Sequence, residues 1–426
     1  MHLNDAIESL ANFIETLELD NKPIEGLFRD RTVLINRGDH TVILTGDDAD
    51  RYSGIAQAIY TAVSARRPMS RSAITDLVDN YLLRVLKSGD HRENSSIREL
   101  LAAEMKDLKR KLFEKTKRWK VHLTVEGLAP SGLPQLVGNS NFELYEETQI
   151  AELKTRLLQV RAQSGAAVNE AVEAQMQADL DTLKGKAVAT ISVSAVDQAA
   201  AIEIARRNLQ ITIDTINFYA SREKLGGWAF LPGDSSSQAE LQIAISDAGD
   251  LHAGYRRAGP IRKIPLNQLA GRPGFKRVSD ILSKEERSDL EERILASFQW
   301  AGRAQVEQRR DEAFLLYAIA LESLLLGRDI KTELSYQLGL RCAHLGGGPA
   351  IEDRRLVLEQ IASLYNVRSA TVHSGSFAVS EADLELIRQY TLVSLFIIVD
   401  KEPFRSMTKV RELDLWFEAQ LLTAGL

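Results

Sequence analysis

The spacing of hydrophobic residues divides the chain into a mixed N-terminal region and a helical C-terminal region. In the first 270 residues, apolar positions alternate in some stretches and recur every three or four residues in others, as strands and helices require. The pattern predicts strands at 32–35, 41–44, 119–125, 187–193, 228–231, 239–245 and 261–264. It predicts helices at 5–18, 47–66, 70–87, 96–116 and 199–218, and a polar helical stretch over 146–183 that breaks near Ser164.

From residue 278 onward, every predicted element is a helix. The clearest helical patterns cover 285–304, 310–326, 335–345, 353–367 and 381–399. A Gly-Arg-Pro-Gly sequence at 271–274 indicates a domain boundary, since both residue types interrupt regular structure. We therefore expect an α+β protein, with a mixed region over 1–274, a second break in it near 90–118, and an antiparallel helical bundle over 275–426.

Composition narrows the possible partners and compartments. The chain has 426 residues and a formal net charge of -6, so any nucleic-acid contact must come from a local patch. Its single cysteine, Cys342, cannot form a disulfide or a cysteine-based zinc site within one chain, which indicates a reducing compartment. We see neither a signal-peptide pattern nor an apolar stretch long enough for a membrane span. We expect a cytoplasmic protein without a membrane partner.

One stretch of this acidic chain is strongly basic. Residues 106–120 contain eight Lys and Arg residues and only two acids, Asp107 and Glu114. Such a run can neutralise phosphates and release their counterions. It can equally be a solvated face whose charges are balanced by acids elsewhere in the fold. The candidate RNA contacts in this run are Lys109, Arg110, Lys111, Lys117 and Arg118.

A short motif near the end of a predicted helix combines Arg368 with His373. The guanidinium is always charged, and the imidazole titrates near neutral pH. Together they can hold a phosphate and move a proton on a neighbouring hydroxyl, without a metal or a cofactor. By itself the motif has little specificity. The alternative is an Arg that binds the carbonyls of a helix end and a His that caps the next element.

The surroundings of the motif resemble a known family. Three blocks occur in a fixed order, AIALESLL at 318–325, LGLRCA at 338–343 and LYNVRSATVHSG at 364–375. They follow the phrase ASFQWAGRA at 296–304. Over residues 290–400 the chain resembles the HEPN superfamily, and within it the Apea-like HEPN domains of abortive-infection proteins. The preceding 270 residues resemble only the variable front part of such proteins.

The resemblance implies a metal-independent endoribonuclease that needs no cofactor. Related toxins and antiphage defence effectors cleave RNA, often tRNA, when an infection is sensed. Arg368, Ser369 and His373 match the family motif at its shortest spacing, and Ser374 stands where these proteins more often run directly from His to Gly. Such nucleases usually form a homodimer in which two motifs face one cleft. The resemblance thus implies RNA, a second copy of the chain and a phage-derived trigger as partners.

The chemistry of RNA cleavage suits these side chains. The 2′-hydroxyl is the nucleophile, so His373 can act as general base or acid, and Arg368 can bind the phosphate oxygens as their charge grows. Ser369 can hold the imidazole or the ribose. On one straight helix, Arg368 and His373 lie about 140° apart. They reach one cleft only if the helix ends or bends between them, or if two protomers combine.

Other residues leave alternatives open. Glu322 lies on an apolar helix face and needs a partner, either Arg341 or Arg368, and the pair either orients the site or joins two helices. His344 and Cys342 supply too few ligands for a metal site. The main alternative function is a non-catalytic HEPN module for dimerisation, or for binding nucleotides or proteins, that regulates a partner effector.

Overall fold

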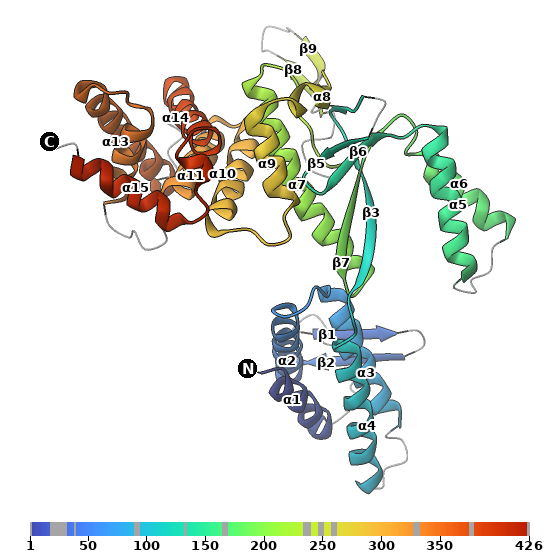
Figure 1. The fold of residues 1–426 in the computed structure, drawn as a ribbon. Helices are drawn as coiled ribbons and strands as arrows, with labels where there is room; N and C mark the ends of the chain where they lie inside the picture. Colours follow the sequence, from blue (N-terminus) through green and yellow to red (C-terminus); the bar gives the residue numbers. More distant parts are fainter. Residues whose placement is uncertain are drawn as a thin grey trace. The chain divides into compact units, whose positions relative to one another are not determined.

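The computed structural model contains two compact units built from helices and small sheets (Figure 1). It describes residues 2–17, 32–37, 40–88, 94–131, 134–163, 169–232, 240–245, 251–256, 262–326, 333–374 and 379–423, for some of them only the backbone. Unit 1 comprises Met1–Val121 and Ser192–Ala205, and unit 2 comprises His122–Ile191 and Arg206–Leu426. The predicted mixed α+β class is confirmed at this level.

Residues on both sides of the boundary predicted at residue 274 belong to unit 2. Helix α9 (Pro273–Ser283) begins inside the presumed linker. Its Ser279 hydroxyl accepts a hydrogen bond of 2.8 Å from the backbone N–H of Gly138, in the sheet region. Gly138 has φ +62°, and a Cβ on it would lie 2.6 Å from the Leu282 Cβ, so the sheet turn packs directly on α9. The chain passes between the two units near Val121, Ile191 and Ala205, and the first of these lies just beyond the secondary break suggested at 90–118.

Unit 1 combines helices with one hairpin. Its elements are α1 (Leu3–Thr16), β1 (Thr32–Arg37), β2 (His40–Thr45), α2 (Gly46–Ser64), α3 (Arg71–Ser88) and α4 (Asn94–Leu112). The predicted hairpin is confirmed, with Ile35 opposite Val42. The apolar stripe of α1 places Ile7, Leu10 and Phe13 in the core. Strands β3 (Lys117–Val125) and β7 (Ala187–Ala195) and helix α7 (Gln198–Arg222) continue from one unit into the other.

The largest sheet has the strand order β3-β7-β6-β5. Strands β5 (Gln135–Val137) and β6 (Ser140–Leu144) pair antiparallel, as do β6 and β7. Neither β5 nor β6 was predicted from the sequence. Both strands are too short to show an alternating pattern, and Leu136 is 69% exposed, so their pairing depends on the neighbouring strand.

Smaller sheets were predicted less well. Strands β4 (Leu128–Ala129) and β10 (Ile264–Pro265) are parallel, and β8 (Glu240–Ile245) and β9 (Leu251–Arg256) are antiparallel. The strand predicted at 228–231 is reduced to one bridge, between Glu126 and Phe230.

The polar stretch over 146–183 forms two helices, α5 (Glu147–Gln163) and α6 (Glu170–Asp181). Ile150 and Leu180 are the residues that these two helices bury, which agrees with the polar character of the stretch.

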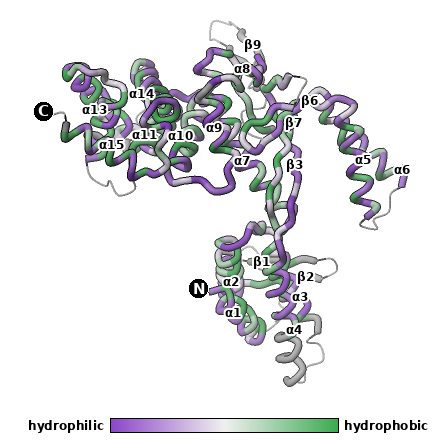
Figure 2. The backbone as a smooth tube through the Cα atoms, viewed as in Figure 1, coloured by the Kyte–Doolittle hydropathy of each residue, from purple (hydrophilic) through white to green (hydrophobic). Residues whose placement is uncertain are grey.

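The C-terminal part of unit 2 is helical. Its elements are α8 (Leu266–Ala270), α9, α10 (Asp289–Val306), α11 (Arg310–Leu325), α12 (Leu334–Gly346), α13 (Ile351–Ser374), α14 (Glu381–Asp400), the short 3₁₀ turn η2 (Phe404–Ser406) and α15 (Val410–Thr423). Helix α11 is the most apolar and packs against α10, α13 and α14, with Phe314 and Leu321 fully buried. Figure 2 shows hydrophobic and hydrophilic residues interleaved along the helices, as amphipathic packing requires. Within the described residues, no helix combines the length and apolar character needed to cross a bilayer.

Candidate active site

Helix α13 carries the Arg368–His373 motif. It runs without interruption from Ile351 to Ser374, so the helix end predicted near Val367 is wrong by seven residues. Residues 368–374 contain no Gly or Pro, and the first glycine after them is Gly375. Because the helix does not end between Arg368 and His373, their positions lie about 140° apart around its axis. The side chain of His373 lies outside the described part of the structure.

Arg368 faces α11 and pairs there with Glu322. Its Nε lies 3.3 Å from Glu322 Oε1, and its Nη2 donates a hydrogen bond of 3.4 Å to Oε2. Both contacts come from the same side of the guanidinium, and both side chains are mostly buried, with 28% of Arg368 and 20% of Glu322 exposed. Arg368 shares its helix face with the core residues Ile361 and Leu364. The pair therefore lies at the border between the bundle core and solvent.

The contact between these two groups is loose for an ion pair. Both distances exceed the usual range of about 2.7–2.9 Å for a charge-assisted hydrogen bond. The buried atoms Nε of Arg368 and Oε1 of Glu322 lie within ion-pair distance, but they are not aligned for a hydrogen bond. Burial raises the pKa of Glu322, and the positive charge of Arg368 offsets only part of that rise. The carboxylate is therefore incompletely compensated.

Tyr365 completes the cluster and was missed by sequence reasoning. It lies three residues before Arg368 on the same face of α13, and the Arg368 Cζ lies 5.7 Å from its ring centroid. Burial and the charge of Glu322 raise the pKa of the Tyr365 phenol, so it stays protonated and can donate a hydrogen bond. The sequence signal that could have found it is this three-residue spacing. Ser369, the next position after Arg368, is half-buried.

Arg341 belongs to a different cluster. Its Nη1 donates to Asp414 Oδ1 of α15 at 2.7 Å and to the carbonyl of Leu325 at 2.6 Å, and its guanidinium lies over the Phe417 ring. It joins α12 to α15 and to the C-terminus of α11. Of the two partners considered for Glu322, Arg368 is therefore the one that pairs with it in the structure. The arrangement gives Arg341 a structural role, and among the described side chains it makes no polar contact with the α13 motif.

Cys342 and His344 lie two positions apart on α12. The Cys342 thiol is fully buried, and burial raises its pKa to about 12. Burial and the neighbouring Arg354 lower the pKa of His344. Across the described ranges, no three His, Cys, Asp or Glu side chains gather closely enough to hold a metal ion.

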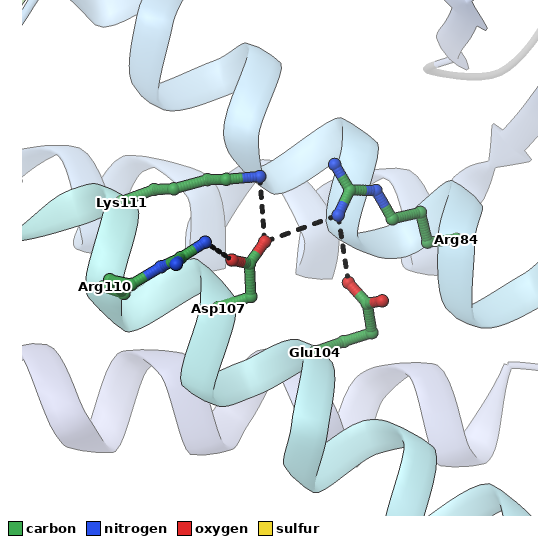
Figure 3. Close-up of polar contacts among 5 residues, drawn as sticks. All are labelled: Arg84, Glu104, Asp107, Arg110 and Lys111. Atoms are coloured by element: carbon green, nitrogen blue, oxygen red, sulfur yellow. Dashed lines mark hydrogen bonds and ion pairs between the residues drawn. The ribbon is translucent and has the colours of Figure 1, made fainter.

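The basic run lies on α4 and at the start of β3, within unit 1, whereas α13 belongs to unit 2. Its charges are partly neutralised within the run (Figure 3). Asp107 pairs with Arg110, with Lys111 at 2.8 Å and with Arg84 at 3.4 Å. The hydrogen bond from Lys111, with a smaller effect of Arg110, lowers the pKa of Asp107.

The remaining candidates of the basic run differ in their partners. Lys117 pairs with Glu114 at 3.3 Å, and both side chains are more than half exposed. Lys109 and Arg118 form no ion pair among the residues that the structure describes. Of the five predicted RNA contacts, these two cations are the ones left free for a phosphate.

Comparisons with protein-family models, curated proteins and solved structures found no match for this chain.

Proposed function

We propose that this chain is a metal-independent endoribonuclease of the HEPN type, acting on RNA in antiphage defence by abortive infection, with tRNA as the first substrate to test. The protein would act in the cytoplasm as a homodimer. The observation that carries the proposal is the mostly buried pair of Glu322 and Arg368 at the family-like motif on α13. It holds a permanent cation at the edge of the bundle, where a phosphate can approach.

The proposed reaction uses the nucleophile that RNA itself carries. A base removes the proton of the 2′-hydroxyl, whose oxygen attacks phosphorus while the bond to the 5′-oxygen breaks. An acid then protonates that leaving oxygen. The products are a 2′,3′-cyclic phosphate and a 5′-hydroxyl end. His373 is assigned to proton transfer, a role typically worth about 10²–10⁴-fold in rate.

Arg368 is assigned to the phosphate. Its contacts with Glu322 use Nε and Nη2, so Nη1 and the outer N–H groups stay available for the non-bridging oxygens. These bonds strengthen as negative charge develops in the transition state. Glu322 and Tyr365 do not touch the substrate in this scheme, so they are positioning residues that restrict the guanidinium.

The continuity of α13 bears on which residues can share one cleft. One straight helix sets the positions of Arg368 and His373 about 140° apart. We therefore assign the cleft to two copies of the chain, each supplying one motif. Two copies also supply two imidazoles, one for each proton transfer.

A second candidate function has an observation in its favour. Glu322 and Tyr365 already occupy one edge and one face of the Arg368 guanidinium, and a pair that only joins α11 to α13 would make the same contacts. In that reading the bundle is a dimerisation or binding module that regulates a partner effector.

The deciding experiment uses purified protein with total RNA and tRNA in EDTA, followed by mapping of the cut ends. Wild type and Arg355→Ala should cleave, whereas Arg368→Ala and His373→Ala should not. Arg355 is the matched control because it is an exposed arginine on the same helix. If all four proteins are silent, with and without phage lysate, the binding-module function replaces the nuclease. If all four cleave alike, the site lies elsewhere.

A further inference from the structure

Unit 1 contains a hollow between α2, α3 and β1. Its volume is about 220 Å³, and its wall includes Ile35, Tyr52, Tyr60, Arg71, Thr75 and Asp79. Ligand pockets for drug-sized molecules usually measure about 300–1,000 Å³, so this hollow can enclose only part of a ligand of that size. The residues that line it range from buried polar side chains to an exposed arginine.

The inner end of the hollow is polar and sheltered. Asp79 is 9% exposed and Tyr52 is 3% exposed, and the Tyr52 hydroxyl donates a hydrogen bond to Asp79 Oδ1. A carboxylate has about four acceptor positions, so it can take a further hydrogen bond from a ligand amine. Ile35 also lines the hollow and is almost fully buried. This end therefore suits a flat, partly apolar group that carries a hydrogen-bond donor.

The outer end of the hollow is positively charged. Arg71 is exposed, its Cζ lies 5.7 Å from the Tyr60 ring centroid, and it forms no ion pair within the described part of the chain. It is also the first residue of α3. An exposed guanidinium without an acidic partner is well suited to bind an anion.

We propose that unit 1 binds a mononucleotide whose base carries an exocyclic amine, with Arg71 on the phosphate and Asp79 accepting from the amine. Arg71, Thr75 and Asp79 follow one another at four-residue intervals on one face of α3, so Arg71 and Asp79 lie ~12 Å apart along the helix axis. An amino acid carries its carboxylate and ammonium on one carbon and cannot reach both. A nucleotide separates the two groups by a ring and a sugar.

The test is isothermal titration calorimetry with four mononucleotides, AMP, IMP, CMP and UMP. AMP should bind about ten-fold more tightly than IMP, and CMP more tightly than UMP, because the first of each pair has an amine where the second has a carbonyl. Equal affinities within both pairs would remove the role of Asp79. No heat and no thermal shift from any of the four at ~1 mM would overturn the proposal.

Substitutions of Arg71 and Asp79 test which residue binds the phosphate and which binds the amine of the ligand. Arg71→Ala should weaken AMP about ten-fold or more and leave adenosine, which lacks the phosphate, unchanged. Retained adenosine binding also shows that the variant is folded. Asp79→Asn should narrow the difference between AMP and IMP, since an amide both donates and accepts. The control is Arg66→Ala, another exposed arginine of unit 1 that does not line the hollow.

The proposal is independent of RNA cleavage. Nucleotide titration requires no RNA, and Arg368→Ala should bind AMP like wild type. A protein that cleaves RNA without binding any mononucleotide would refute the hollow as a site and leave the nuclease intact. The converse result would refute the nuclease alone.

Discussion

Two clusters in this protein each combine a carboxylate with basic side chains, but their environments differ. On α11 and α13, one carboxylate, Glu322, meets one guanidinium, Arg368, and both are mostly buried. On α3 and α4, Asp107 meets three cations that are about one third to three quarters exposed. We call these the α13 pair and the Asp107 cluster. Burial raises the pKa of Glu322, whereas its neighbours lower that of Asp107.

The difference teaches that residue type alone does not identify a functional cation. In the Asp107 cluster, water and several partners share the charges, so the loss of one group is compensated by the others. In the α13 pair each group depends on a single partner, and the low local polarity strengthens every remaining interaction. The single, mostly buried pair at the Arg368–His373 motif is therefore the more informative feature.

The largest expected difference between the two clusters is in RNA cleavage. Arg368→Ala should lower the cleavage rate by about 10²–10³-fold, because the charge that develops on the phosphate loses its donor. Arg110→Ala, in the Asp107 cluster, should change the rate by less than about two-fold, since Arg110 already shares Asp107 with two other cations. Single-turnover rates on one tRNA measure both effects. Equal losses of cleavage rate in the two variants would show that Arg368 is no more important for cleavage than Arg110.

The second largest expected difference between the two clusters is in their contribution to the free energy of unfolding. Glu322→Ala leaves a mostly buried guanidinium without its carboxylate and should cost about 1–3 kcal/mol. Asp107→Ala should cost no more than about 1 kcal/mol, as for other exposed pairs. Urea unfolding followed by circular dichroism and tryptophan fluorescence gives both values. The double variant Glu322→Leu with Arg368→Leu should regain most of the loss, because apolar groups can replace a buried pair; a loss as large as the single variant's would contradict this account.

The salt dependence of RNA binding should separate the members of the basic run. If the run contacts phosphates, Lys109→Ala with Arg118→Ala should lower the slope of log affinity against log salt by about 1.4, since each phosphate on a single strand contributes about 0.7. Arg110→Ala with Lys111→Ala should lower it less, because these two cations share Asp107. Unchanged slopes for both pairs would identify the run as a solvated face.

The smallest expected effects are in the pH dependence of stability, and they have opposite signs. The folded-state pKa of Glu322 is raised, so its contribution is fully present below the unfolded value and is lost as the pH rises through the folded value. The folded-state pKa of Asp107 is lowered, so its contribution is present above the unfolded value and is lost as the pH falls through the folded value.

These signs are measured by comparing wild type with Glu322→Gln and Asp107→Asn between pH ~3 and ~7. From low to high pH, wild type should lose stability relative to Glu322→Gln and gain stability relative to Asp107→Asn. Urea midpoints at each pH provide the comparison. A shift of the same sign for both variants would contradict the opposite environments of the two acids.

The sequence by itself determined the local features of this protein. The β1–β2 hairpin and most helices followed from hydrophobic spacing, because an amphipathic stripe or a β-branched alternation carries its own signal. The same reasoning found Arg368 and Glu322 as candidate partners and noted that a straight helix separates Arg368 from His373. Each of these depends on residues that are near in sequence or on a small choice of partners.

Only the tertiary structure decided which distant residues meet. It selected Arg368 for Glu322 and Asp414 for Arg341, and it brought Arg84 of α3 to Asp107 of α4. It also paired β6 with β7 and enclosed the hollow of unit 1. These features depend on contacts between residues tens of positions apart, and hydrophobic periodicity contains no information about such pairs.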